Sequence, residues 1–142
     1  MSYSADANLF LYASDRSSPH HAKASSFLDS RVNDPDLFCL TWPTLMTYVR
    51  IATHPRIYAS PSRLEETLAF ARVLLEQPTC TVVQPGPRHF SIFEDLCRRA
   101  AATGNLVQDA WLAALALESG CEWVTTDGDY ARFPGLRWHR PF

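Results

Sequence analysis

Short strand-like segments alternate with helix-like segments along this chain, and that alternation limits the fold most strongly. Residues 37–41 (Leu-Phe-Cys-Leu-Thr) are an almost unbroken apolar run. A run of this kind is typical of a strand whose two faces are both covered, as in a parallel sheet. Strands that alternate with helices predict an α/β fold, with a mostly parallel sheet of four to five strands and helices on both faces.

The sequence also predicts where the elements lie. The expected strands are residues 3–5, 37–41, 79–83, 122–126 and 136–139. The expected helices are residues 8–14, 19–32, 43–51, 62–76, 88–103 and 105–119. Ser62 and Glu65 match a capping box for the fourth helix, and Gly104 is expected to stop the fifth. Phe90 and the tryptophans are expected in the core.

Composition indicates a single folded domain but says little about its function. The chain has 142 residues, of which 46% are hydrophobic, so residues 1–142 fit a single domain with a real core. The net charge of −2 provides no global basic field for nucleic acid. Arginine supplies nearly all of the positive charge, which is compatible with phosphate contacts or simply with codon usage.

Nothing in the sequence indicates export or a membrane. The four cysteines lack the spacing of a zinc site and are expected to be small buried residues in a reducing compartment. The N-terminus has neither the basic start nor the apolar centre of a signal peptide. We therefore expect a cytoplasmic protein with no membrane association.

Aspartates stand where the expected elements would bring them together. Asp6 follows the first strand, and Asp127 and Asp129 follow the strand at 122–126. Asp109 lies one turn into a helix, with Asn105 four residues before it. Ligands of open α/β sheets bind beyond the carboxyl ends of the strands. Convergence there would create an all-oxygen site suited to a hard divalent cation and to phosphodiester hydrolysis.

Each aspartate also has a purely structural interpretation. Asp6 is suited to capping the helix that follows it, and Asp109 to the solvated first turn of its own helix. Asp127 and Gly128 form a common turn pair. Only their joint placement favours a metal site over these alternatives.

Four segments resemble the PIN-domain family, most closely the VapC-type toxins of bacterial toxin–antitoxin modules of the mycobacterial kind. The segments are 6–8 (Asp-Ala-Asn), 53–56 (Thr-His-Pro-Arg), 104–116 and 125–133. They occur in the family's order and span essentially the whole chain. The resemblance implies a PIN fold and an endoribonuclease that uses Mg²⁺ or Mn²⁺ to cut structured RNA such as tRNA or rRNA.

The resemblance also assigns residues and partners. It implies that Asp6, Asp109, Asp127 and Asp129 are catalytic and that the first three bind the metal. Asn8, Asn105 and Thr126 match supporting polar positions, and Thr47 is expected to support the site as well. A homodimer and a VapB-like antitoxin, whose tail occupies the acidic pocket, are also implied.

One position departs from the family pattern. Thr47 stands three residues before Arg50, where many members have a glutamate. Fewer direct ligands, or a single metal, would follow. The alternative is a PIN fold that has lost catalysis and only binds RNA or a partner. Two other enzyme classes fit less well. A phosphatase with an aspartyl nucleophile needs a second acid where this chain has Asn8. A receiver domain needs a lysine at the end of a late strand, and the sole lysine here, Lys23, lies in an early expected helix.

Arginines are the expected contacts for RNA phosphates. Arg50 and Arg56, around the end of the third expected helix, are predicted to bind RNA. The same role, or plain surface, is open to a further group: Arg88, Arg98, Arg99 and Arg132.

Overall fold

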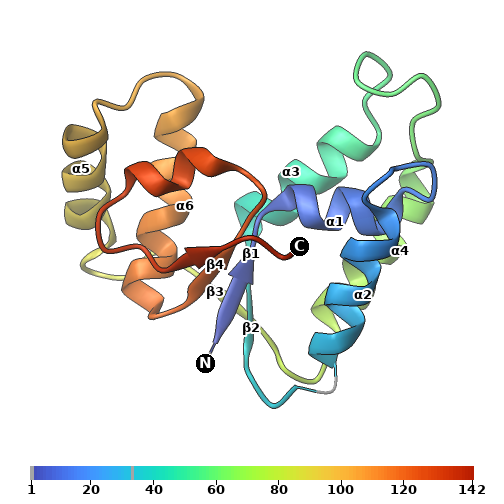
Figure 1. Cartoon of the computed structure of the whole chain (residues 1–142), viewed down its shortest axis with the longest axis horizontal. Coiled ribbons are helices and arrows are strands. Elements are labelled where there is room, and N and C mark those ends of the chain that lie inside the picture. The colour runs from blue at the N-terminus through green and yellow to red at the C-terminus, as the bar shows by residue number, and fades with distance from the viewer. Residues whose placement is uncertain (1, 33) are drawn as a thin grey trace.

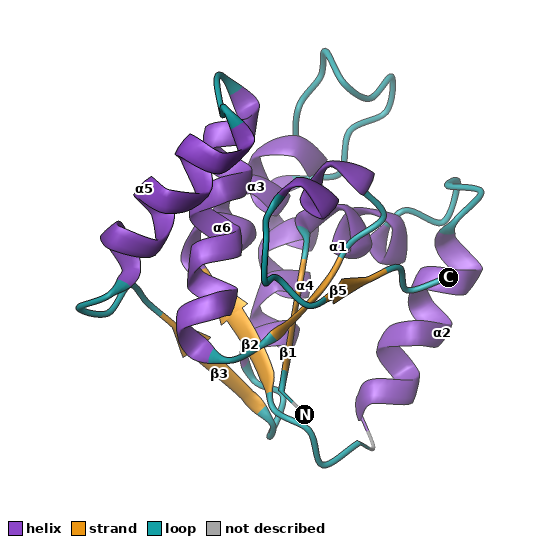
Figure 2. Ribbon diagram, turned by 60° about the vertical axis from the view of Figure 1, so that its left-hand side comes forward, coloured by secondary structure: helices purple, strands orange, loops and turns teal. Residues whose placement is uncertain are grey.

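A five-stranded parallel sheet forms the centre of the molecule. The computed structural model describes residues 2–32 and 34–142. The strands are β1 (Tyr3–Ala5), β2 (Phe38–Thr41), β3 (Cys80–Val83), β4 (Glu122–Val124) and β5 (Trp138–His139). Their order across the sheet is β3-β2-β1-β4-β5, and all neighbours are parallel. Figure 2 shows these strands with helices packed around them.

Helices connect the strands and cover both faces of the sheet. They are α1 (Ala7–Ser14), α2 (His21–Val32), α3 (Trp42–Ala52), α4 (Leu64–Leu75), α5 (His89–Ala100) and α6 (Asn105–Ser119). A 3₁₀ helix, η1 (Gly128–Arg132), follows β4. Helices α1 to α4 lie to one side of the sheet, and α5 and α6 lie to the other (Figure 1). The predicted α/β class, with helices on both faces, is therefore confirmed.

Two apolar clusters, one on each face, fix this arrangement. Phe38 and Leu40 of β2 pack with α1, α3 and α4, whereas Cys39 between them packs with α5 and α6. The alternation follows from the two-residue period of a strand. Both faces are apolar because both are covered, which explains the unbroken run at 37–41.

The strand order changes direction at β1. The chain adds β2 and β3 on one side of β1 and later adds β4 and β5 on the other. The loops after β1 and β4 therefore diverge to opposite faces and leave a crevice at the carboxyl ends of these two strands. Asp6 follows β1, so the topology places this acid at the crevice.

Several predicted boundaries are wrong. Helix α4 begins at Leu64 after Arg63, and no side chain caps it, so Ser62 does not form a capping box. Helix α5 ends at Ala100, and Ala101 takes the left-handed conformation expected of a glycine (φ 50°). Gly104 instead precedes α6 as its N-cap, with φ 58°.

The core prediction fails at two aromatic side chains. Phe90 is 60% exposed and Trp42 is 49% exposed. Trp123, in contrast, is fully buried. Across the described part of the chain, every helix is too short or too polar to span a lipid bilayer.

Candidate functional site

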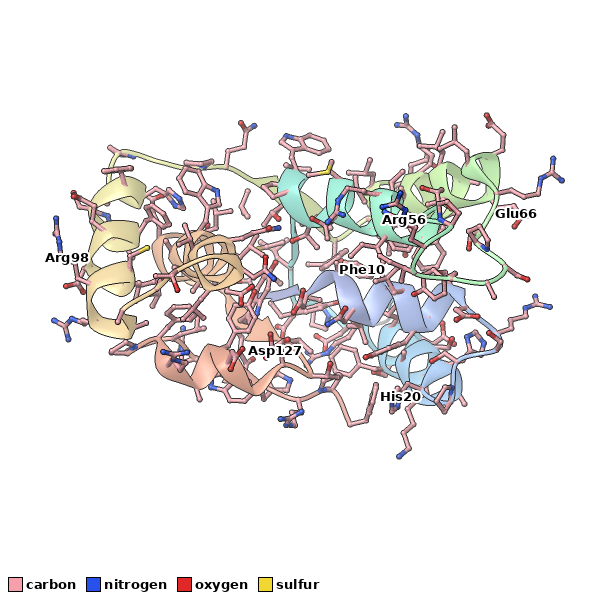
Figure 3. The ribbon with its side chains drawn as sticks, turned by 90° about the horizontal axis from the view of Figure 1, so that it is seen from above. Phe10, His20, Arg56, Glu66, Arg98 and Asp127 are labelled. Atoms are coloured by element: carbon pink, nitrogen blue, oxygen red, sulfur yellow. The ribbon has the colours of Figure 1, made fainter. Side chains whose placement is uncertain are left out.

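A cavity of about 410 Å³ opens at the crevice between β1 and β4. It gathers side chains from α1, α3, α6 and the segment after β4, which are far apart in sequence. In Figure 3 Asp127 lies near the middle of the molecule, at this meeting of elements. We call it the acid cavity. Its polar and charged lining consists of Asp6, Asn8, Thr44, Thr47, Arg50, Asn105, Gln108, Asp109, Asp127 and Asp129.

Asp6 is held between the two central strands. Its backbone N–H donates to the Val124 carbonyl (2.9 Å), which continues the β1–β4 pairing by one residue. The Thr125 hydroxyl donates to Asp6 Oδ2 (2.8 Å). Burial raises the pKa of the Asp6 carboxyl, the Thr125 hydrogen bond opposes this, and the Asp127 charge adds to it.

Asp109 enters the acid cavity from the first turn and a half of α6. The buried Tyr130 hydroxyl donates to its Oδ1 (3.2 Å). Burial, followed by the charge of Asp127, raises the pKa of Asp109 to about 6. The Asp6 and Asp129 charges act in the same direction. Asp109 is therefore a carboxyl whose charged form the surrounding protein disfavours.

Asp127 combines a structural role with a place in the cavity. Its Oδ1 accepts the Asp129 backbone N–H (2.9 Å) and so caps η1. Its own backbone N–H donates to Thr125 Oγ1 (3.0 Å). Asp127 is therefore a turn residue, as its structural interpretation predicted, and it lines the acid cavity as well. Asp129 is exposed at the same cavity.

The donor set suits a hard cation. Carboxylates of Asp6, Asp109 and Asp127 face one space, and burial together with repulsion from the other carboxylates raises the pKa of Asp109. Thr47 Oγ1 is buried at this cavity without a hydrogen-bond partner in the described structure. Within the described residues, no three acidic, histidine or cysteine side chains are drawn together to coordination distance. The oxygen chemistry and unbalanced charge nevertheless fit a divalent cation.

The arginines divide between the cavity and the rest of the surface. Arg50 lines the acid cavity, whereas Arg56 does not. Arg98 and Arg99 pair with Glu94 and Asp95 on α5. Figure 3 shows Arg98 pointing away from the molecule at one end, remote from Asp127.

The predicted supporting residues are placed unevenly. Asn8, Asn105 and Thr47 line the acid cavity. Thr126 does not; its carbonyl accepts a hydrogen bond from Arg140. The threonine that touches an acid is Thr125, which sequence reasoning missed because the strand was expected to run to residue 126.

Sequence reasoning also missed Tyr130 and Thr44. Tyr130 is 1% exposed, and only the Asp-x-x-Tyr spacing after β4 hinted at a hydroxyl directed back at the cavity. Thr44 lines the cavity and accepts the Thr41 hydroxyl (2.7 Å). Both are ordinary core or helix residues by sequence pattern alone.

Comparisons with known proteins identify the family of the chain. The family model described as the PIN domain matches residues 3–136. The chain belongs to the PIN-domain family. It is also 35% identical over 136 residues to ribonuclease VapC33 of Mycobacterium tuberculosis, covering 96% of this chain and 95% of the relative. At that identity and coverage, this PIN-domain chain belongs with the VapC ribonucleases.

Solved structures show the same fold at lower identity. A VapBC2 complex from Rickettsia felis, bound to a DNA fragment from its promoter, aligns with a TM-score of 0.75 and 14% identity. That alignment covers 99% of this PIN-domain chain and 98% of the other. The sarcin-ricin loop cleaving toxin VapC20 of M. tuberculosis aligns with a TM-score of 0.65 and 18% identity, over 96% and 99% of the two chains.

Proposed function

We propose that residues 1–142 form one PIN domain that acts as the toxin of a toxin–antitoxin pair in the cytoplasm. In this proposal it cuts phosphodiester bonds of structured RNA, such as tRNA or rRNA, with Mg²⁺ or Mn²⁺ as cofactor. Asp6, Asp109 and Asp127 hold the cation, and Asp129 stands beside them. The observation that carries the proposal is that all four aspartates line one cavity at the sheet's switch point in a VapC-type chain.

The cation, when bound, offsets the charge of the scissile phosphate and lowers the pKa of water. The chain's own residues supply orientation. Thr125 fixes one oxygen of Asp6, and Tyr130 fixes one oxygen of Asp109. Asp129 is exposed at the cavity and is placed to accept a proton from the attacking water. Arg50 is placed to bind a phosphate of the RNA backbone.

The test is cleavage of a labelled structured RNA by the purified protein. We expect cleavage with Mg²⁺ or Mn²⁺, none with EDTA, and none by the folded Asp6→Asn or Asp109→Asn variants. Circular dichroism of each variant provides the control for folding. Undiminished cleavage by both variants would refute the assignment of these acids.

Binding without catalysis is the alternative, and Thr47 motivates it. A chain without the usual glutamate would then bind RNA and leave it intact. Specific RNA binding by the protein, with no cleavage under any divalent cation, would favour this alternative.

The partners are proposed from the same family. The Rickettsia felis structure is of a VapBC2 complex. For this chain we expect a VapB-like antitoxin with a basic side chain that enters the acid cavity and satisfies the carboxylates as a cation would. We also expect a homodimer, which light scattering of the purified protein would test.

A further inference from the structure

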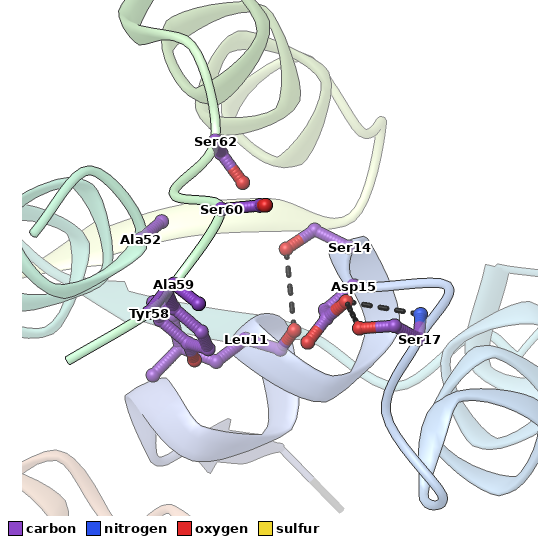
Figure 4. Close-up of a pocket in the computed structure, with 9 residues that line it drawn as sticks. All are labelled: Leu11, Ser14, Asp15, Ser17, Ala52, Tyr58, Ala59, Ser60 and Ser62. Carbon is purple, nitrogen blue, oxygen red and sulfur yellow. Dashed lines mark hydrogen bonds between the residues drawn. The ribbon is translucent and has the colours of Figure 1, made fainter. Parts of the chain in front are cut away.

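A second cavity, of about 350 Å³, lies between the end of α1 and the loop that joins α3 to α4. Its size is within the range of small-molecule sites. Figure 4 shows Ser14, Asp15 and Ser17 on one side of it, with Ser60 and Ser62 facing them from the loop. We call it the hydroxyl cavity.

We propose that the hydroxyl cavity is a base-binding subsite of the nuclease. It receives an unstacked RNA base that carries an exocyclic amino group and disfavours uracil. The inference rests on the proposed function, since it deepens the substrate recognition of the same enzyme.

The first argument is position. Asn8 and Leu11 stand at i and i+3 on one face of α1, and Asp15 is the C-cap residue at the end of this helix. Asn8 lines the acid cavity, whereas Leu11 and Asp15 line the hydroxyl cavity. The two cavities thus lie along the same face of α1. Helix α1 has eight residues and is about 12 Å long, a length of roughly three to four nucleotides at about 3.4 Å each.

Residues of α3 also show that the two cavities are neighbours. Helix α1 packs against α3, where Ile51 lines the acid cavity and the next residue, Ala52, lines the hydroxyl cavity. The two cavities are therefore neighbours on one seam between two helices.

The second argument is chemistry. Asp15 Oδ1 accepts both the backbone N–H (3.0 Å) and the hydroxyl (2.6 Å) of Ser17, so the carboxylate is oriented and Oδ2 is left for a ligand. None of the described residues that line the hydroxyl cavity is a lysine or an arginine. A carboxylate without a cation repels phosphate and the carbonyl edge of uracil, but it accepts from an amino group, as it does from cytosine N4.

The third argument is shape. Tyr58 and Leu11 form an apolar wall of the hydroxyl cavity, and an aromatic ring next to polar groups is how proteins hold splayed-out RNA bases (Figure 4). The loop that carries Tyr58 is anchored: the Tyr58 N–H donates to the His54 carbonyl (3.1 Å) and the Ser62 N–H to the Ala52 carbonyl (2.9 Å). The wall is therefore formed before any ligand binds.

This subsite also gives a role to the His54-Pro55-Arg56 segment. The Arg56 backbone N–H donates to His54 Nδ1 (3.1 Å), which holds the segment at the start of the same loop. Arg56 lines neither cavity and is exposed two residues before Tyr58. An exposed guanidinium there is suited to a backbone phosphate next to the bound base.

The experiment compares two ligands that differ at one edge, cytidine and uridine monophosphate. Each is titrated by calorimetry into the full-length Asp6→Asn protein, into Asp6→Asn/Asp15→Asn, and into Asp6→Asn/Asp29→Asn. Asp29 is exposed on α2, outside both cavities, and makes a matched control. Asparagine keeps an acceptor for Ser17 but adds a donor, so the fold is retained while the preference changes.

We expect cytidine monophosphate to bind about tenfold more tightly than uridine monophosphate, the effect of one hydrogen bond to a charged acceptor. The Asp15→Asn change should bring the ratio close to one, and the Asp29→Asn change should leave it intact. Equal binding of both nucleotides to the Asp6→Asn protein, or an unchanged ratio in the Asp15→Asn protein, would overturn the subsite.

A second measurement separates this inference from the nuclease assignment. A randomised RNA pool is cut by wild-type protein and by Asp15→Asn, and the new ends are sequenced. Depletion of uracil at one fixed distance from the cut, lost in Asp15→Asn, supports the subsite. Cutting without such depletion overturns the subsite alone. Nucleotide discrimination without any cutting supports the subsite and overturns the nuclease assignment.

Discussion

The acid cavity and the surroundings of His89 differ in the charge of the buried polar groups that they hold. His89 is 1% exposed, and neither of its ring nitrogens has a hydrogen-bond partner in the described structure. It packs edge-on against Trp111, with ring centroids 4.2 Å apart. Burial lowers its pKa, opposed by the charge of Glu118. His89 is therefore a neutral aromatic side chain in an apolar layer.

In the acid cavity, by contrast, neighbouring groups of the same charge are kept together. Asp6 and Asp109 each receive a hydroxyl hydrogen bond, but burial and mutual repulsion still raise their pKa values. An imidazole that only packs can lose its charge at little cost. In the proposed function the carboxylates of the acid cavity keep their charge in order to bind a cation, which lowers the stability of the protein when no cation is bound.

The largest expected effect is on RNA cleavage, from substitutions that separate the charge of Asp127 from its role in the turn. Asp127→Asn keeps an acceptor for the Asp129 N–H but removes the charge, so cleavage should fall about 100-fold or more. The melting temperature should stay close to wild type. Asp127→Ala, which loses both roles, should also lower the melting temperature. A cleavage rate in Asp127→Asn near that of wild type would leave Asp127 as a turn residue only.

The next effect concerns the missing fourth acid. Thr47→Glu adds a carboxylate at the acid cavity, where Thr47 Oγ1 has no described partner, and should tighten Mn²⁺ binding about tenfold. Titration calorimetry measures this, with Thr47→Gln as the uncharged control of equal length. Equal Mn²⁺ affinity in the two variants would show that the position does not face the cation.

Removing one charge should stabilise the metal-free protein. Asp109 has a raised pKa of about 6, so its contribution to folding is favourable below pH 4 and is lost as the pH rises through 6. Since the carboxyl is partly open to solvent, Asp109→Asn should raise the free energy of unfolding by only about 1 kcal/mol at pH 7.5. Urea unfolding in EDTA measures the difference, which should vanish at pH 4. A destabilised variant at pH 7.5 would contradict the account of repulsion.

The smallest expected effect lies in the apolar layer. A lowered pKa makes wild type lose stability as the pH falls below the unfolded-state value of about 6.5. His89→Phe should flatten this loss, by less than about 1 kcal/mol between pH 7 and 5, and leave RNA cleavage unchanged. His20→Gln, at an exposed histidine, is the control and should not flatten it. If the stability of His89→Phe changed with pH as much as that of wild type, the account of His89 as a buried neutral side chain would be wrong.

The sequence predicted those features that depend on hydrophobic pattern and strand order. The apolar run at 37–41 indicated a doubly covered strand, and parallel strands bring Asp6 and Asp127 to one edge whatever the details of packing. The placement of Asp109 followed from the helix start. These predictions needed no knowledge of side-chain contacts.

The sequence did not predict which side chains point into the acid cavity or into the core. A strand that ends two residues early changes which threonine faces the acid, so Thr125 bonds to Asp6 instead of the predicted Thr126. On α5, His89 is buried while the more apolar Phe90 is exposed, because α5 packs on α6 through the face that carries His89. Intrinsic preference for burial favoured the opposite choice.

The pairing of β1 with β4 also makes the acid cavity a late product of folding. The hydrogen bond between Thr125 and Asp6 spans 119 positions, so it closes a very long loop of the chain. A growing polypeptide therefore holds Asp6 without Thr125 and Asp127 until those residues have been synthesised and β4 has paired with β1. Until that pairing forms, the carboxylates of the acid cavity are separate and do not repel one another.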